Sequence, residues 1–287
     1  MNKFKVVMSS IVLSFCASSA NAGIISTFED AGLVATDIQD TVDDFRNALG
    51  PNNGNAPVNG DPLGRRQINW DALPDALSDP TLFPGDFFNG DSAPRARGIE
   101  FKPTGTTTGF LVSSTLASGV PVAFGFDDFL PRFSDERLFA SIGGSSFDIN
   151  FYDPSDQTTK ATVRGFGAVF SGLDFADTVE MQFLNLADEL IGVMNPLGTS
   201  EFDLNFAGAI FDSAEIATVR ILGGNRFLEG NGSFGGGSGD GFVFDDFIFG
   251  EPIAAEVSAP PAFSLLLLSF IGAIVSRKRK AFVEKAC

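Results

Sequence analysis

Alternation of apolar and polar residues predicts a chain built mainly of β-strands from about residue 99 onward. In VEMQFLNL (179–186) and FDLNFAGAIF (202–211), apolar residues alternate with acids and amides, which predicts strands with one buried face. Turn-forming residues recur between such runs, so the pattern favours an antiparallel β-sandwich, with a jelly-roll as the preferred topology. The other strand candidates are GFLVSS (109–114), RLFASI (137–142), FDINFY (147–152), ATVRGFGAVF (161–170), ELIGVM (189–194), IATVRIL (216–222) and FVFDDFIF (242–249).

One stretch before these strands has a helical period instead. Its apolar residues recur at positions i, i+4, i+7 and i+11 and form one stripe, which we expect to pack on the core: Ile38, Val42, Phe45 and Leu49. Thr36 and Gln39 fit a capping box at the start, and Gly50 with Pro51 ends the helix. The pattern predicts one N-terminal α-helix.

Residues 51–98 are rich in Pro, Asn, Gly and Asp, and they predict an irregular segment that wraps the core. The segment also contains large apolar side chains that need burial, which argues against disorder: Trp70, Leu73, Phe83, Phe87 and Phe88. We therefore expect 23–98 and 99–252 to form one domain, with the sandwich in the second part.

The N-terminal residues 1–22 read as a secretory signal peptide. A basic start precedes an apolar stretch at 6–17 that is too short to span a membrane, and Ala20 and Ala22 occupy the small-residue positions of a cleavage site. The prediction is export through Sec-type machinery, with cleavage after Ala22. A lipoprotein signal around Cys16 is the alternative.

The C-terminal residues 253–287 form a second segment outside the predicted body. After a short linker, the motif VSAP leads into an apolar run from Ala259 to Ser276, 18 residues that predict a separate hydrophobic helix. A helical span takes about 20 apolar residues, so this run inserts marginally, and its basic end stays on the cytoplasmic side. The motif and the basic block comprise Val257, Ser258, Ala259, Pro260, Arg277, Lys278, Arg279 and Lys280.

This three-part tail resembles the PEP-CTERM sorting signal of Gram-negative bacteria, in which a Val-Pro-Glu-Pro motif precedes an apolar helix and an arginine-rich end. Val257 and Pro260 match that motif, whereas Ser258 and Ala259 replace its Pro and Glu. The resemblance implies transient insertion in the inner membrane, processing by an exosortase-type transpeptidase, and release to the cell surface or outside. It also implies an association with extracellular polysaccharide and biofilm. An uncleaved anchor is the alternative.

The body resembles a second group of proteins. The stretches GRRQINWDALPDA, FPGDFFN, RGFGAVFSGLDFAD and FVFDDFIFGEP are similar to those of a widespread group of secreted bacterial β-sandwich proteins without an assigned activity. This resemblance implies a fold and no mechanism.

Composition removes several kinds of chemistry. Histidine is absent, and the only cysteines, Cys16 and Cys287, lie in the two end segments. A Ser-His-Asp triad, the usual zinc ligands and a disulfide within the body are therefore excluded. Residues 23–256 carry 12 basic and 35 acidic side chains, a net charge of −23, which disfavours nucleic acid, anionic sugars and anionic membranes as partners.

Two sequences, FGFDDF (124–129) and FVFDDF (242–247), place paired aspartates among apolar residues. Neighbouring strand residues point to opposite faces, so we expect one carboxylate of each pair to point inward and to need a partner. Structural pairing with arginine is the leading account, with these candidates: Arg65, Arg66, Arg137 and Arg220. The sequence calls for no cofactor, but calcium is the second account. Its candidate ligands are Asp240, Asp245 and Asp246, or the Asn-rich stretch NNGNAPVNGD (52–61). A hydrolase with two carboxylates is the third.

The favoured function is therefore a structural or interaction protein of the cell surface or extracellular matrix. A glycan-binding module, stabilised by calcium, is the alternative, and an enzyme is the least favoured class. Sugars usually stack on exposed Trp or Tyr, and the chain has 32 Phe but only Trp70 and Tyr152 of those types. Both are candidate glycan contacts, although the apolar surroundings of Trp70 favour a buried plug.

Overall fold

The strands expected from the alternating pattern are present, and they form sheets on either side of an apolar core. The computed structural model describes residues 23–113, 130–134, 136–199, 203–224, 226–229, 234–235 and 239–255. Besides the helix α1 (Ala35–Leu49) and a short 3-10 helix at Asp75–Leu77, the elements are β1 (Ile24–Gly32), β2 (Arg65–Ile68), β3 (Ile99–Pro103), β4 (Gly109–Val112), β5 (Phe139–Ile142), β6 (Phe147–Phe151), β7 (Ala161–Thr162), β8 (Gly165–Ser171), β9 (Val179–Leu184), β10 (Leu190–Met194), β11 (Leu204–Phe211), β12 (Thr218–Gly223), β13 (Phe227–Leu228), β14 (Phe234–Gly235), β15 (Val243–Gly250) and β16 (Ile253–Ala254).

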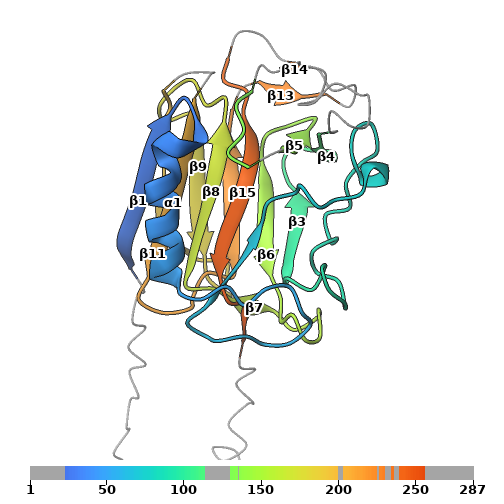
Figure 1. Cartoon of the computed structure of the whole chain (residues 1–287), viewed down its shortest axis with the longest axis vertical. Helices are drawn as coiled ribbons and strands as arrows, with labels where there is room; N and C mark the ends of the chain where they lie inside the picture. The colour runs from blue at the N-terminus through green and yellow to red at the C-terminus, as the bar shows by residue number, and fades with distance from the viewer. Residues whose placement is uncertain are drawn as a thin grey trace, which may run out of the picture. The chain divides into compact units, whose positions relative to one another are not determined.

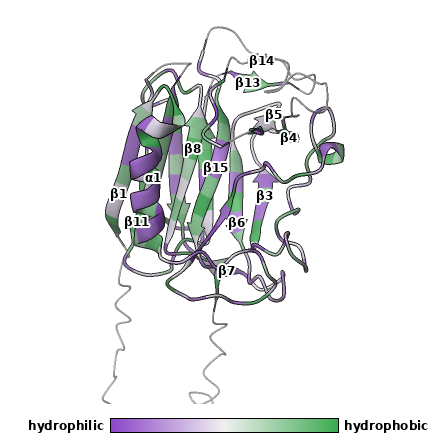
Figure 2. Ribbon diagram, in the orientation of Figure 1, coloured by the Kyte–Doolittle hydropathy of each residue, from purple (hydrophilic) through white to green (hydrophobic). Residues whose placement is uncertain are grey.

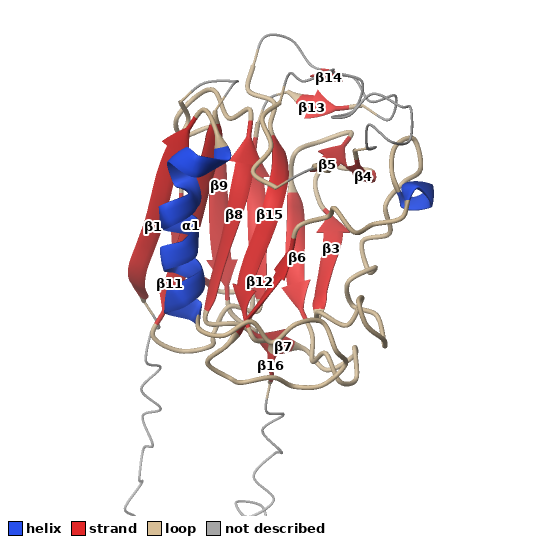
Figure 3. Ribbon diagram, viewed as in Figure 1, coloured by secondary structure: helices blue, strands red, loops and turns tan. Residues whose placement is uncertain are grey.

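Two large sheets organise the body (Figure 1). The nine-stranded sheet has the order β1-β11-β8-β15-β5-β13-β14, with β2 paired to β15 and β4 to β5. The five-stranded sheet has the order β10-β9-β12-β6-β3, and β16 and β7 form a small third sheet. Within the two large sheets, the described strand pairs are antiparallel except β13 with β5. The chain is thus mainly β, with antiparallel sheets and one described α-helix, consistent with a β-sandwich (Figure 3).

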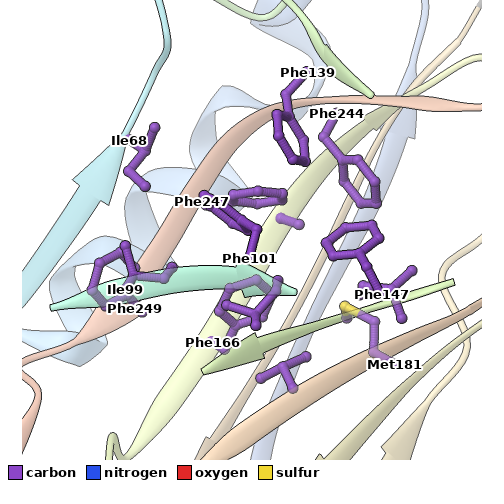
Figure 4. Close-up of a cluster of buried hydrophobic side chains, with 14 of the residues drawn as sticks. Ile68, Ile99, Phe101, Phe139, Phe147, Phe166, Met181, Phe244, Phe247 and Phe249 are labelled. Carbon is purple, nitrogen blue, oxygen red and sulfur yellow. The ribbon is translucent and has the colours of Figure 1, made fainter. Parts of the chain in front are cut away.

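Phenylalanine rings fill the main core cluster, to which both large sheets contribute (Figure 4). Phe101 and Phe147 come from the five-stranded sheet, and Phe139, Phe244 and Phe247 come from the nine-stranded sheet. Ring centroids across this cluster lie 5.5 Å apart for Phe147 and Phe244, and 5.6 Å apart for Phe101 and Phe247. Edge-to-face and tilted contacts of this kind add to the free energy of burying the rings. The high Phe content therefore serves the interior.

The helix α1 covers the outer face of the nine-stranded sheet, where it contacts β1, β11 and β15. The four stripe residues are fully buried, as the sequence predicts. Figure 2 shows a hydrophilic helix surface above hydrophobic strands. The predicted cap is wrong: the helix begins one residue before Thr36, and the Asp37 carboxylate accepts a hydrogen bond from the Val34 N–H at 3.1 Å. The predicted end at Gly50 is confirmed, with φ of 102° there.

Because α1 covers that face, the central strands are buried on both sides. Leu204 and Phe206 of β11 pack against α1, while Ala207 belongs to the core between the sheets. Asn205, which we expected on an exposed face, is fully buried. The expectation of one buried face is therefore wrong for β11, and it is confirmed for β9, where Glu180 and Gln182 lie outside the core.

Three strands in the first part of the body were not predicted. β1 pairs with β11 at one edge of the nine-stranded sheet, β2 pairs with β15, and β3 pairs with β6. The segment between β2 and β3 wraps the core as predicted. Trp70 is 1% exposed, which confirms the buried plug, and it stacks on Phe139 with centroids 4.3 Å apart.

The chain divides into two compact units, Met1–Ile253 and Ala254–Cys287. Among the residues described, no helix is both long and apolar enough to cross a membrane. The predicted C-terminal hydrophobic helix and the predicted signal peptide lie outside the described residues.

Candidate functional site

The residues predicted to act in processing lie outside the described part of the chain. They are Ala20 and Ala22 of the signal peptide and Val257, Ser258, Ala259, Pro260, Arg277, Lys278, Arg279 and Lys280 of the tail. The first aspartate pair, Asp127 and Asp128, lies outside it as well. The second pair and both predicted glycan contacts are described.

The second pair, Asp245 and Asp246, sits at a β-bulge in β15. The register of β15 on β8 shifts between Phe244 and Phe247, so that two residues oppose one on the partner strand. The bulge cancels the alternation that predicts one carboxylate on each face. Both side chains are buried, and the Ser134 hydroxyl donates to Asp245 Oδ1 at 2.8 Å and to Asp246 Oδ1 at 3.3 Å.

The two carboxyl groups have different partners. Asp245 Oδ2 accepts hydrogen bonds from the backbone N–H groups of Phe133 at 2.6 Å and Ser134 at 3.2 Å. Asp246 Oδ2 accepts a hydrogen bond from Arg46 of α1 at 2.9 Å. The pair therefore ties the helix and the 130–134 segment to the centre of the nine-stranded sheet.

Burial and mutual repulsion perturb the titration of this pair. Burial raises the pKa of Asp245 well above its usual range, and the charge of Asp246 raises it further. Burial also raises the pKa of Asp246, although Arg46 opposes that rise. Of the two carboxyl groups, Asp245 is therefore the one that takes up a proton more readily, whereas Arg46 favours the charged form of Asp246.

Pairing with arginine, the leading account of the aspartate pairs, is confirmed for Asp246 alone, and the arginine that it meets is not one of the four proposed. Three of those four pair with other acids, and Arg65 donates instead to the backbone oxygen of Gly50. Ion pairs among described residues include Arg46–Asp43, Arg46–Asp246, Arg66–Glu251, Arg137–Asp75 and Arg220–Asp148.

Asp240, the third candidate calcium ligand, has a separate structural role. Its carboxylate accepts hydrogen bonds from the backbone N–H groups of Asp174 and Phe175 and from the Thr178 hydroxyl. These bonds hold the loop after β8 next to the start of β15. Within the described ranges, no three acidic side chains gather where they could share an ion. Calcium binding stays a prediction.

Two recesses share the lining side chains Asn69 and Arg97. The larger part, of about 300 Å³, is lined by the segment between β2 and β3, and the smaller part, of about 160 Å³, also by residues before and within β2. We call the two parts together the Arg97 groove. The larger part is lined by Asn69, Trp70, Ala72, Leu73, Pro74, Phe87, Phe88, Pro94, Arg95 and Arg97, and the smaller part by Asn52, Gly54, Asn55, Gln67, Asn69 and Arg97.

Arg97 is the central side chain of this groove. Its Nε donates to the Pro94 carbonyl at 3.2 Å, its Nη1 donates to the Gln67 carbonyl at 2.8 Å, and its guanidinium carbon lies 4.5 Å from the Phe88 ring centroid. It forms no ion pair within the described ranges. Burial, with the charge of Arg66 second, lowers the pKa of Arg97 to about 10, so the side chain remains charged at neutral pH.

Tyr152 lines a different recess, of about 500 Å³, which we call the Tyr152 hollow. It lies beside β3 and β6, and it contains both lysines of the body, Lys102 and Lys160, together with Asn150 and Glu100. Burial, followed by the charge of Glu100 and a hydrogen bond with it, raises the pKa of Tyr152. The hollow is thus polar and carries charges of both signs.

The structure places the two predicted glycan contacts in separate recesses. Trp70 lines the Arg97 groove, but it is too buried to serve as a stacking platform. Tyr152 is half-buried in the other recess. Sequence reasoning missed Arg97, for which the only available signal was an arginine pair, Arg95 and Arg97, inside an aromatic-rich segment. Searches against protein-family models, curated proteins and solved structures found no match.

Proposed function

We propose that this protein is exported, sorted by its C-terminal segment, and retained in the surface or extracellular matrix as a structural or interaction component. The tail carries the proposal: a VSAP motif, a marginal apolar run and a basic block follow one another in the order of an exosortase signal. We also propose that the apolar run is helical, that it inserts transiently in the inner membrane, and that the body is a jelly-roll without catalytic function.

The arrangement of the body supports this proposal. The start of β1 lies at one end of the two large sheets, and the short strand β16 lies at the same end (Figure 3). The signal peptide would precede β1, and the sorting tail would follow β16. A body that enters and leaves its sheets at one end keeps the opposite end free of chain termini, which suits display from a surface.

The intact mass of the protein from its native host tests the proposal. We expect loss of residues 1–22 and of everything beyond the VSAP region, and recovery of the body in the surface or extracellular fraction. A full-length chain in the membrane fraction would contradict processing.

Charge removal sharpens the test. Replacing the four residues of the RKRK block with glutamine should abolish processing, because the block holds the tail on the cytoplasmic side. The matched control is Lys285→Gln, which removes one charge outside the block. Equal processing of the two variants would refute the role given to the block.

The second candidate function is glycan binding, stabilised by calcium. The Tyr152 hollow favours it, because amide, ammonium and phenol groups line one recess and could hydrogen-bond sugar hydroxyls. A glycan array with and without calcium tests this function. Tyr152→Phe should weaken binding while keeping the packing of the ring. A flat array in both conditions, with no change in melting temperature on adding calcium, would remove this candidate.

A further inference from the structure

We infer that the Arg97 groove binds a carboxylate-bearing sugar, the uronate of an acidic polysaccharide. This inference rests on the glycan-binding candidate and specifies the ligand for a groove that the sequence did not predict.

Charge is the first argument. The body carries 35 acidic and 12 basic side chains, yet the residues that line both parts of the groove include Arg95 and Arg97 and no acid. The charge of Arg66 lowers the pKa of Arg97, but Arg66 itself forms an ion pair with Glu251 at 2.8 Å. A positive recess on so acidic a molecule attracts an anionic group that the rest of the surface repels.

Unfilled hydrogen-bonding capacity is the second argument. Two of the three nitrogens of Arg97 donate to backbone carbonyls, and the third, Nη2, has no partner within the described ranges. The side-chain oxygen of Gln67, in the smaller part of the groove, is buried without a partner there. A guanidinium nitrogen can only donate a hydrogen bond, so it suits a carboxylate oxygen. An amide oxygen can only accept one, so it needs a donor such as a hydroxyl. One sugar acid offers both groups.

The walls are the third argument. Phe87, Phe88, Pro74 and Pro94 line the larger part of the groove and could contact the C–H faces of a sugar ring. The guanidinium carbon of Arg95 lies 4.7 Å from the Phe87 ring centroid, which holds its charge at this wall. Asn55 and Asn69 line the polar part. A compact inorganic anion would leave these walls unused, so an organic acid with hydroxyl groups fits better.

Calorimetric titration of the full chain with three oligosaccharides tests the inference. The probes are a 1,4-linked oligouronate, the same oligomer with its carboxylates reduced to hydroxymethyl groups, and a sulfated oligomer of equal length. We expect the oligouronate to bind most tightly, with affinity that falls as salt is added. Equal affinity for the reduced oligomer, or for the sulfated one, would overturn the carboxylate assignment.

Variants locate the site. Asn55→Asp adds a negative charge in the groove without removing a described hydrogen bond, and Arg95→Ala removes an exposed positive charge. Each should weaken oligouronate binding by about tenfold, the range of one charge-assisted contact. Ala187→Asp in the exposed β9–β10 turn and Arg220→Gln on β12 are the matched controls for charge and should have no effect. Groove and control variants that behave alike would overturn the location.

Arg97→Gln removes the central group, and its melting temperature is measured alongside binding because the side chain also holds two carbonyls. Should that variant fail to fold, the Asn55 and Arg95 variants still decide the matter. Binding of the reduced, neutral oligomer alone would contradict this inference but remain consistent with glycan binding. Binding of none of the three oligomers, together with a flat glycan array, would remove both.

Discussion

Replacing either aspartate of the bulge pair with asparagine should have opposite effects on stability, although the two substitutions are isosteric and adjacent. Asparagine at 245 imitates a protonated carboxyl group, the form that burial and the charge of Asp246 favour at this position. Its carbonyl oxygen can still accept from the Phe133 and Ser134 N–H groups. Asparagine at 246 instead removes the charge that faces Arg46.

The sign for Asp245 follows from its raised pKa. Between its ordinary value of 3.8 and the folded value, the native protein holds a proton that the unfolded chain has lost. The contribution of this group to stability is therefore greatest at low pH and falls as pH rises through that interval, by about 1.4 kcal/mol for each pKa unit. Asp245→Asn abolishes this decline. The free energy of unfolding of the variant, relative to that of the wild type, should therefore increase as pH rises and become constant above the folded pKa.

The magnitude for Asp246 follows from the surroundings of Arg46. That side chain is 16% exposed and keeps Asp43 as a second partner at 3.0 Å. The loss should therefore be about 1–2 kcal/mol, below the 3–5 kcal/mol typical of a fully buried pair that loses one partner. The change should appear as a lower free energy of unfolding at neutral pH.

Urea unfolding from about pH 4 to about pH 8 measures both effects. The fluorescence of Trp70, the only tryptophan, reports the unfolding because it stacks on Phe139 in the core. Equal losses of stability in the two variants, or an unchanged pH dependence in Asp245→Asn, would refute the different roles given to the two carboxyl groups.

Two further predictions concern packing and charge elsewhere in the body. Glu251→Gln should cost about 3–5 kcal/mol by urea unfolding, because it leaves the charge of Arg66, whose side chain is 0% exposed, without its ionic partner. Asp148→Asn, in the partly exposed pair with Arg220, should cost under about 1 kcal/mol. Gly208→Ala should cost about 1–3 kcal/mol, because the added Cβ would lie 2.9 Å from the Phe45 ring, and Phe45→Leu in the same chain should restore part of that loss. Similar costs for the two charge variants, or strictly additive costs for the glycine and phenylalanine variants, would contradict these predictions.

The sequence predicts the strands and the helix where local pattern determines them. Alternation in β9 and the spacing of the α1 stripe depend only on which side chains share a face. The pattern does not reveal what covers the outer face of a sheet, so the burial of Asn205 was missed. It also does not reveal register, so the bulge that brings Asp245 and Asp246 to one side could not be foreseen.

The candidate site was harder to predict for the same reason. Trp70 and Tyr152 were singled out by residue type, and each lines a recess, but their separation depends on how the 51–98 segment wraps the sheets. Arg97 is notable because no acidic side chain lines its groove. Proximity between segments distant in sequence is the property that composition and spacing leave undetermined.

The first strands of the body have their sheet partners among its last ones. Ile24 of β1 lies opposite Phe211 of β11, and Arg65 of β2 lies opposite Gly250 of β15. A chain synthesised from its N-terminus therefore cannot complete the nine-stranded sheet until nearly every residue has emerged. Such non-local pairing slows folding and leaves unpaired strands exposed meanwhile. The yield of folded protein should therefore depend on how long the early strands stay unpaired before β15 appears.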